Sequence, residues 1–167
     1  VRSTAWLAPL RRKFPRAHVT WVTDAPAHKL LQGHPAVDRV LTASEGDLLA
    51  LSALKFDAAF VVDKSLKASG VLARTEADLL FGFAADPRTG AILPATEAAE
   101  ELWRIGLDDE LKFRGNAKSE IQLMTEALEL GPWRGDRYWL PLDRAQRASR
   151  DQRRDLWSNG GRRPVIG

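Results

Sequence analysis

The chain has 167 residues, of which 44% are hydrophobic and 28% are charged, a balance typical of one folded globular domain. It contains no cysteine, which excludes disulfide bonds, thiolate metal sites and a cysteine nucleophile, and fits a reducing, cytoplasmic location. Its 25 basic and 22 acidic residues give a net charge of +3, too balanced for a dedicated nucleic-acid-binding protein. The sequence has no apolar run near the roughly 20 residues that a membrane helix needs, and its first residues lack the apolar segment of a signal peptide.

Short apolar runs alternate with amphipathic stretches, which is the pattern of βαβ units around a parallel sheet. We therefore predict an α/β domain with a Rossmann-like parallel sheet flanked by helices. An interior proline, Pro9, is expected to disturb the first helix. The elements expected in the first half are a helix over 4–14, a strand over 18–22, a short helix capped by Asp24, a strand over 37–41, a helix over 48–54 and a strand over 58–62.

The second half of the chain continues the alternation and ends in a polar helix. We expect the chain to be a fragment of a longer protein, because residues 164–167 are typical of a strand beginning rather than a domain ending. The expected elements are a helix over 66–74, weaker strands over 79–83 and 91–93, a helix over 97–105, a helix opened by the capping pair Ser119 and Gln122 that stops at Gly131, and a helix over 143–158 that stops at Asn159.

Two segments are candidates for a binding site. Ligands of parallel sheets bind beyond the carboxyl ends of strands, where loops lead into helices. One candidate is 63–69, where Lys64 and Lys67 could supply positive charge, and Ser65 with Ser69 could bond sugar or phosphate oxygens. The alternative is that Asp63 or Ser65 only caps the following helix.

The second candidate segment opens the first helix. Ser3 and Thr4 could contact a ligand there, or could serve only as the cap of that helix. The three histidines lack metal-ligand spacing, so we expect no metal site. Neither a glycine-rich phosphate loop nor a Gly-x-Ser-x-Gly nucleophile motif is present.

Basic residues gather in three short stretches. Such clusters attract phosphate or an anionic membrane face, although solvated helix faces explain the same pattern. The stretches are Arg11-Arg12-Lys13 with Arg16, the segment 144–154, and Arg162-Arg163.

Several segments, taken in order, resemble family 9 glycosyltransferases, the ADP-heptose:lipopolysaccharide heptosyltransferases and their relatives. The resemblance covers 1–142. In 33–41 it rests on a Gly-His-Pro-Ala-Val-Asp-Arg-Val-Leu segment in which His34 occupies the usual place of an asparagine. The other segments that carry the resemblance are 1–15, 18–23, 56–65 and 106–114.

The resemblance implies the N-terminal half of a GT-B fold. The acceptor-binding domain would span 1–142, and 143–167 would be the linker and the start of a donor-binding domain. The family's first strand, with the aspartate that serves as the proposed base, would precede Val1, so no catalytic residue is assigned. The resemblance implies acceptor contacts at Ser3, Thr4 and Lys64, with Lys67 as the second choice. Ser65 completes the set of acceptor-binding candidates on the ground of its place after the strand.

The activity implied by the resemblance is transfer of a heptose-like sugar from a nucleotide-sugar to a lipid-linked saccharide of the lipopolysaccharide core or a related glycan. The reaction would need neither metal nor cofactor, and this chain alone would be inactive. The protein would contact the cytoplasmic membrane face and no nucleic acid. Two alternatives remain: a non-catalytic Rossmann-like module that binds a phosphorylated ligand, and an interaction domain that uses the arginine-rich segment 144–154.

Overall fold

The computed structural model describes residues 2–163, and the expected strand start at 164–167 lies outside the described residues. The architecture is mixed α/β, as predicted. The elements of the first half are η1 (Arg2–Trp6), α1 (Leu7–Lys13), β1 (Thr20–Thr23), η2 (Ala27–Leu30), β2 (Arg39–Thr42), α2 (Glu45–Ser52), β3 (Lys55–Val61) and α3 (Leu66–Leu72). Those of the second half are β4 (Glu76–Ala85), β5 (Ile92–Pro94), η3 (Glu97–Ala99), α4 (Glu100–Ile105), η4 (Leu111–Gly115), α5 (Glu120–Ala127) and α6 (Arg144–Ser158).

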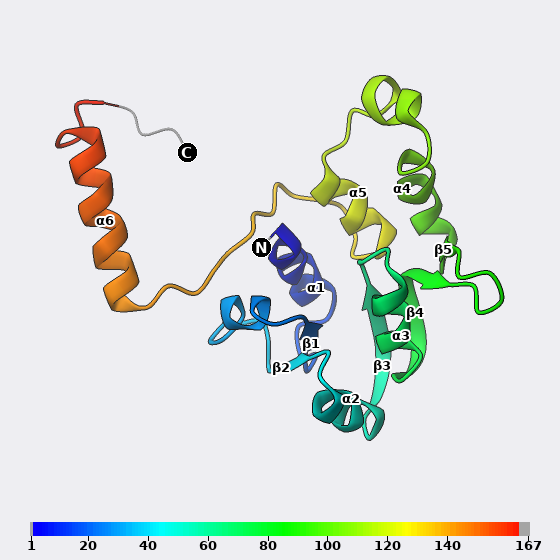
Figure 1. Ribbon diagram of the computed structural model, residues 1–167. Helices are drawn as coiled ribbons and strands as arrows, with labels where there is room; N and C mark the ends of the chain where they lie inside the picture. Colours follow the sequence, from blue (N-terminus) through cyan, green and yellow to red (C-terminus); the bar gives the residue numbers. More distant parts are fainter. Residues whose placement is uncertain (1, 164–167) are drawn as a thin grey trace.

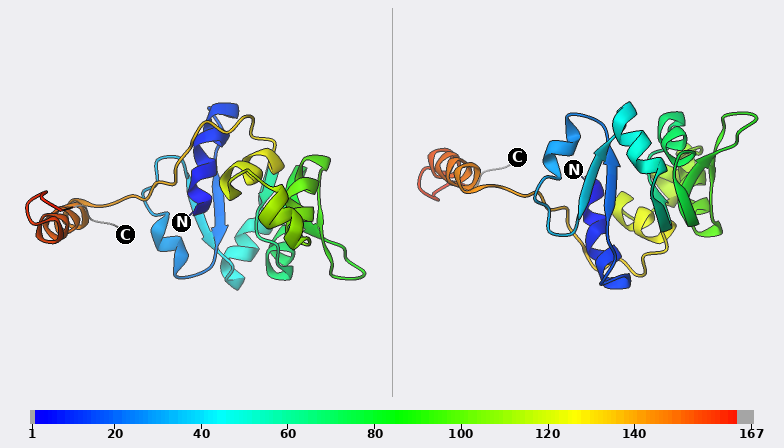
Figure 2. Two further views of the ribbon diagram at one scale, coloured as in Figure 1. Left: turned by 90° about the horizontal axis from the view of Figure 1, so that it is seen from above. Right: turned by 90° about the horizontal axis from the view of Figure 1, so that it is seen from below.

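The strands form two sheets, which corrects the prediction of one parallel sheet. β1 pairs with β2 in parallel, β3 pairs with β4 in parallel, and no ladder joins the two pairs within residues 2–163. β5 pairs antiparallel with β4, because the short turn between them, in which the Gly90 N–H bonds to the Asp86 carbonyl, leaves no room for a crossover. Figure 2 shows α2 and α3 on one side of the strands and α1, α4 and α5 on the other.

Pro9 lies inside the first helical stretch without the expected disturbance. The chain is 3-10 helical over η1 and becomes α-helical at Leu7, so Pro9 falls in the first turn of α1. A missing N–H in the first turn removes no helical hydrogen bond. The proline ring is buried and contributes to packing instead.

Side-chain caps begin α5 and α6 where the sequence predicted them. The Ser119 hydroxyl accepts a hydrogen bond from the Gln122 N–H at the start of α5. Asp143 and Gln146 form a reciprocal capping box at the start of α6, and Asn159 ends that helix with a φ of 50°. The predicted polar helix over 143–158 is therefore confirmed almost to the residue.

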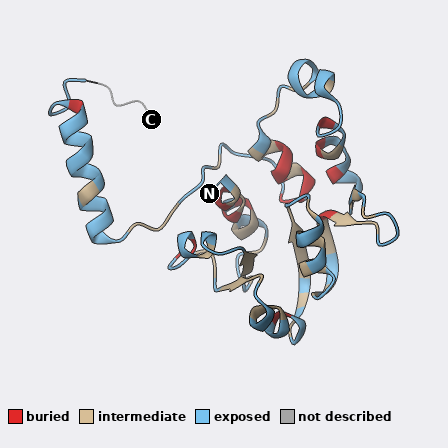
Figure 3. Cartoon of the chain, viewed as in Figure 1, coloured by how far each residue is buried: buried red, intermediate tan, exposed pale blue. Residues whose placement is uncertain are grey.

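The main core lies between β4 and the helices α4 and α5. Phe83 is fully buried there, and Trp6 of η1, Leu10 of α1 and Phe14, which follows α1, lie at its margin. Figure 3 shows the buried residues concentrated in η1, α1, α4 and α5. Trp103 is partly buried at this margin and donates its indole N–H to the Ile92 carbonyl, which joins α4 to β5.

α6 stands apart from the rest of the molecule. Figures 1 and 2 show it at the end of an extended segment, well separated from the strands and from the other helices. Its residues are exposed except for Ser149 and Ser158. Within residues 2–163, no helix is both long enough and apolar enough to span a membrane.

Candidate functional site

The segments that follow β1 and β3 meet at one end of the molecule. Asp24 directly follows β1, and Lys67 lies in the first turn of α3, which follows β3. The Lys67 Nζ lies 2.7 Å from Oδ1 and 2.8 Å from Oδ2 of Asp24. The carboxyl ends of β1 and β3, which belong to different sheets, therefore lie near one another.

Lys64 lies three residues beyond the end of β3, and its ammonium group contacts the body of the protein. Nζ donates a 3.0 Å hydrogen bond to the Leu102 carbonyl and lies 4.6 Å from the centre of the Phe83 ring. Gly106 makes room for this group, because a Cβ at 106 would lie 3.3 Å from Nζ. The ammonium is thus held between the end of β3 and the end of α4.

Lys64 is exposed as a residue, but the contacts of its ammonium with the Leu102 carbonyl and the Phe83 ring remove part of its water and make its charge less favourable. This desolvation lowers the pKa of Lys64 below the ordinary lysine value, and the negative charge of Glu120 opposes this shift in part. No salt bridge among residues 2–163 involves Lys64. A partly desolvated cation with free N–H donors is suited to bind an anionic ligand.

Glu120 also connects this region to the start of the described chain. Its Oε2 lies 2.5 Å from Nη1 of Arg2, which opens η1. Both side chains of this pair are largely exposed, with 74% and 59% of their surface accessible. The two candidate segments, one around Lys64 and one at 2–4, therefore both approach the start of α5.

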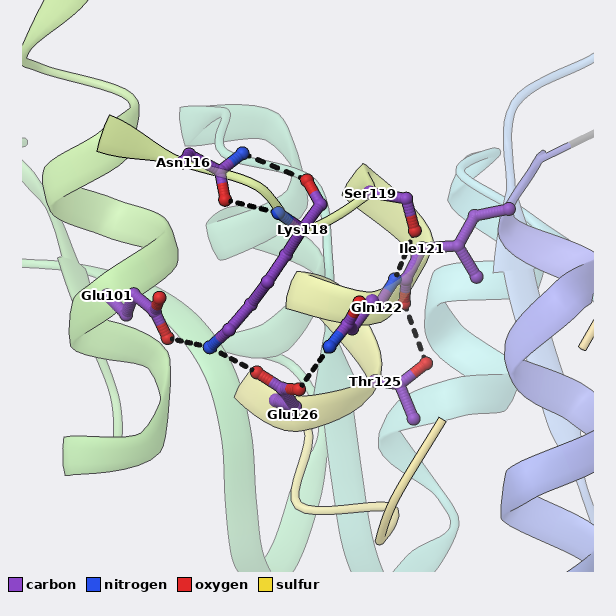
Figure 4. Close-up of polar contacts among 8 residues, drawn as sticks. All are labelled: Glu101, Asn116, Lys118, Ser119, Ile121, Gln122, Thr125 and Glu126. Carbon is purple, nitrogen blue, oxygen red and sulfur yellow. Dashed lines mark hydrogen bonds and ion pairs between the residues drawn. The ribbon is translucent and has the colours of Figure 1, made fainter. Parts of the chain in front are cut away.

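The start of α5 is held by a polar network (Figure 4). Lys118 Nζ lies 2.7 Å from Glu101 Oε2 in α4 and 2.9 Å from Glu126 Oε2 in α5. Asn116 bonds to the backbone of Lys118 through both ends of its amide, and Gln122 donates to Glu126. This network fixes the loop that presents Glu120.

The remaining predicted acceptor residues have structural contacts. The Ser65 hydroxyl accepts a hydrogen bond from the Ala68 N–H and caps α3. Thr4 is buried, and its hydroxyl accepts a 3.1 Å hydrogen bond from the backbone N–H of Trp139. Ser3 is half-buried in η1. Of the five predicted acceptor residues, Lys64 has the geometry best suited to a ligand.

Sequence reasoning missed Asp24 and Glu120 as members of this region. Asp24 was expected to cap the next helix, yet its carboxylate binds Lys67, and η2 has no side-chain cap. Its place directly after β1 was the available signal, since Asp63 likewise follows β3 within two residues. Glu120 offered no such signal, because it enters the region only through the packing of α5.

Within residues 2–163, no three histidine, aspartate or glutamate side chains converge on a point where they could hold a metal ion. His34 is buried, and its Nδ1 accepts a hydrogen bond from the Ala36 N–H. Burial lowers the pKa of His34, so the imidazole stays neutral near pH 7. Its ring packs edge-on against Trp139, which is a structural contact.

No protein-family model matches the sequence, and the searches found no similar curated protein and no similar solved structure.

Proposed function

We propose that this chain forms the acceptor-binding side of a glycosyltransferase that transfers a heptose-like sugar to a phosphorylated, lipid-linked saccharide. The observation that carries the proposal is the Lys64 ammonium, held at the strand-end edge by Leu102 and Phe83 and without an ion-pair partner among residues 2–163. The resemblance of the sequence to family 9 glycosyltransferases supplies the reaction, and the α/β architecture is compatible with it.

Lys64 has the role of an acceptor-phosphate contact in this proposal. An ammonium donating to a phosphate oxygen forms a charge-assisted hydrogen bond, worth about 1.5–3 kcal/mol. A phosphate would also relieve the penalty that partial burial places on the charge. Sugar transfer itself requires a base and a donor site, which the proposal assigns to parts of a longer protein.

A non-catalytic module that binds a phosphorylated ligand is the second candidate. It needs only the anion contact at Lys64, with neither a base nor a donor site, and that contact is formed by residues of this chain. The same anion site would then serve binding alone.

Calorimetric titration of the 167-residue chain with sugar phosphates and with the matching unphosphorylated sugars tests the shared anion site. We expect a preference for the phosphates that Lys64→Gln reduces about ten- to a hundredfold. Lys55→Gln is the matched control, since Lys55 begins the same strand at its opposite end. Equal binding of both sugar classes, or no effect of Lys64→Gln, would remove the site.

Transfer assays separate the two candidates. The protein produced from the complete gene is incubated with nucleotide-sugars and a phosphorylated saccharide. Mass spectrometry then detects the added sugar on the saccharide. Formation of a glycosylated product supports the transferase. Binding that persists without any transfer supports the module.

A further inference from the structure

Two basic clusters that look alike in the sequence have different surroundings in the structure. In α1, Arg11 pairs with Asp38, Arg12 pairs with Asp136, and Lys13 donates to the Glu129 carbonyl. These cations are occupied by the chain itself. The arginines of α6 are all exposed, and among the described residues the only ion pair they make is the one from Arg150 to Asp151.

Within residues 2–163, the other elements give α6 no extensive packing surface. This helix has 15 residues, lies apart from every other element, and exposes nearly its whole circumference (Figures 1 and 3). Helices of this length are marginal in water unless one face packs against something. The sequence nevertheless favours a helix here, because both ends carry specific caps. These are the capping box at Asp143 and the left-handed conformation of Asn159.

The residues of α6 are sorted by face. Arg147, Arg150 and Arg154 recur at spacings of three and four residues and so share one side of the helix. Leu156 and Trp157 lie at its carboxyl end, with 76% and 62% of their surface exposed. Arg150, Arg153 and Trp157 line one open groove along the helix, so the indole and the guanidinium groups face the same space.

We propose that α6 is a membrane-surface helix that binds bilayers containing anionic lipids. Five arginines against two aspartates give the helix a net positive charge, complementary to phosphate headgroups. Arg162 and Arg163 extend the same charge beyond its end. This proposal does not depend on the proposed sugar transfer.

The exposed apolar side chains favour a bilayer over a nucleic acid as the partner. A DNA duplex satisfies arginines but gives the exposed indole of Trp157 no apolar surface. At a bilayer, Trp157, which lines the same groove as Arg150 and Arg153, can lie at the boundary between headgroups and acyl chains, where tryptophan concentrates. Leu156, by contrast, lies about half a helical turn away from Arg147 and Arg154. The apolar area is small, so the attraction is mainly electrostatic and depends on salt.

Co-sedimentation of the whole chain with vesicles tests the proposal. We expect binding to vesicles of phosphatidylglycerol with phosphatidylcholine, little binding to pure phosphatidylcholine, and release by added salt. Because each basic residue near an anionic surface contributes on the order of 1 kcal/mol, Arg147→Gln with Arg154→Gln should lower the partition coefficient about thirtyfold. Glutamine preserves helix propensity, which circular dichroism verifies.

Arg74→Gln with Arg88→Gln is the matched control, because both arginines are exposed on the body of the molecule and the change in net charge is the same. Tryptophan fluorescence supplies a second measurement: vesicles should shift the emission to the blue, and Trp157→Phe should abolish that shift. The proposal fails if both arginine pairs weaken binding equally, or if the chain binds a DNA duplex and no vesicle.

Discussion

The Lys67 ammonium donates to both carboxylate oxygens of Asp24, with Nζ 2.7 and 2.8 Å from them. This ion pair joins the segment after β1 to the helix after β3. Since β1 and β3 belong to separate sheets, this ion pair is a lateral connection between them. The two lysines therefore have different hydrogen-bond acceptors: Lys67 donates to a carboxylate, whereas Lys64 donates to a neutral carbonyl.

Lys67→Met should therefore affect stability little and ligand binding less than a change at Lys64. Both partners are more than half exposed, at 63% and 56%, and exposed ion pairs contribute between about 0 and 1 kcal/mol. Urea denaturation measures the stability change, and titration with sugar phosphates measures binding. A larger loss of affinity than that of Lys64→Gln would assign the anion contact to Lys67 instead.

Lys64→Met should change the pH dependence of stability at alkaline pH. The pKa of Lys64 is depressed in the folded state, so between that pKa and the ordinary one the unfolded chain binds more protons, and the wild type gains stability as the pH rises. Below this window the burial penalty on the charge is present in full. Lys64→Met lacks the titrating group, so its urea denaturation should show a smaller gain over the same pH range.

The other lysines titrate in both proteins and cancel in this comparison. Lys55→Met is a control, because Lys55 is 59% exposed and pairs with Glu76 and Asp78. A wild type and a Lys64→Met variant whose stabilities run parallel through alkaline pH would contradict a desolvated ammonium at this position.

Local signals and long-range packing account for what the sequence could and could not predict. The start of α5 and both ends of α6 were predictable because Ser119, Asp143 and Asn159 act within a few residues of themselves; α5 ends at Ala127, short of the predicted stop at Gly131. The division into two sheets was not, because pairing joins residues far apart in the chain. The antiparallel direction of β5 was within reach, since a short turn between two strands forces it.

The candidate site divides in the same way. The place of Lys64 followed from the rule that ligands bind beyond strand ends, but its contacts with Leu102 and Phe83 come from other elements and left no trace in the local pattern. Composition likewise could not separate the basic residues of α1 from those of α6. Only the structure shows that arginines of α1 form ion pairs with Asp38 and Asp136.

Lys118→Met should destabilise the fold near neutral pH and much less in acid. The substitution leaves Glu101 and Glu126 facing each other without a cation, which we expect to cost about 1 kcal/mol after allowance for their exposure. The hydrogen bond from Lys118 is the main cause that holds the pKa of Glu126 below its ordinary value. That stabilisation is present above the unfolded pKa and is lost as the pH falls through the folded one.

Urea denaturation of the wild type and of Lys118→Met at neutral and acidic pH provides the measurement. The difference between the two proteins should shrink as the carboxylates become protonated. Lys55→Met again serves as the control, because its two carboxylate partners are at least as exposed. A difference that stays constant with pH would mean that Lys118 acts through packing alone.

Thr4→Val should loosen the segment that leads to α6 without unfolding the domain. The Thr4 hydroxyl accepts the Trp139 N–H, and valine keeps the shape while leaving this donor without that acceptor. The Trp139 ring retains its edge-on contact with His34. Hydrogen exchange at Trp139 should become faster, while exchange in α5 stays unchanged; equal acceleration in both would indicate a general loss of stability.

Two glycine-to-alanine substitutions should change stability in opposite directions. Gly82 has a φ of +94°, and a Cβ there would lie 2.0 Å from the carbonyl oxygen of Val61 in the paired strand. Backbone atoms cannot move aside as a flexible side chain can, so Gly82→Ala must displace β4 from β3 and should cost about 3 kcal/mol or more. Gly70 lies inside α3 with nothing within 4 Å of its Cβ position, so Gly70→Ala should stabilise the chain by about 0.5–1 kcal/mol through helix propensity.

Thermal and urea denaturation of both variants measure the contrast directly. Because the two substitutions add the same methyl group, the sign of each change depends only on backbone conformation and on the space around Cβ. A tolerated Gly82→Ala would mean that β3 and β4 do not approach as closely as the Val61–Gly82 pairing requires. In that case the position of Lys64, which continues from β3 by three residues beyond Val61, would lose its structural basis.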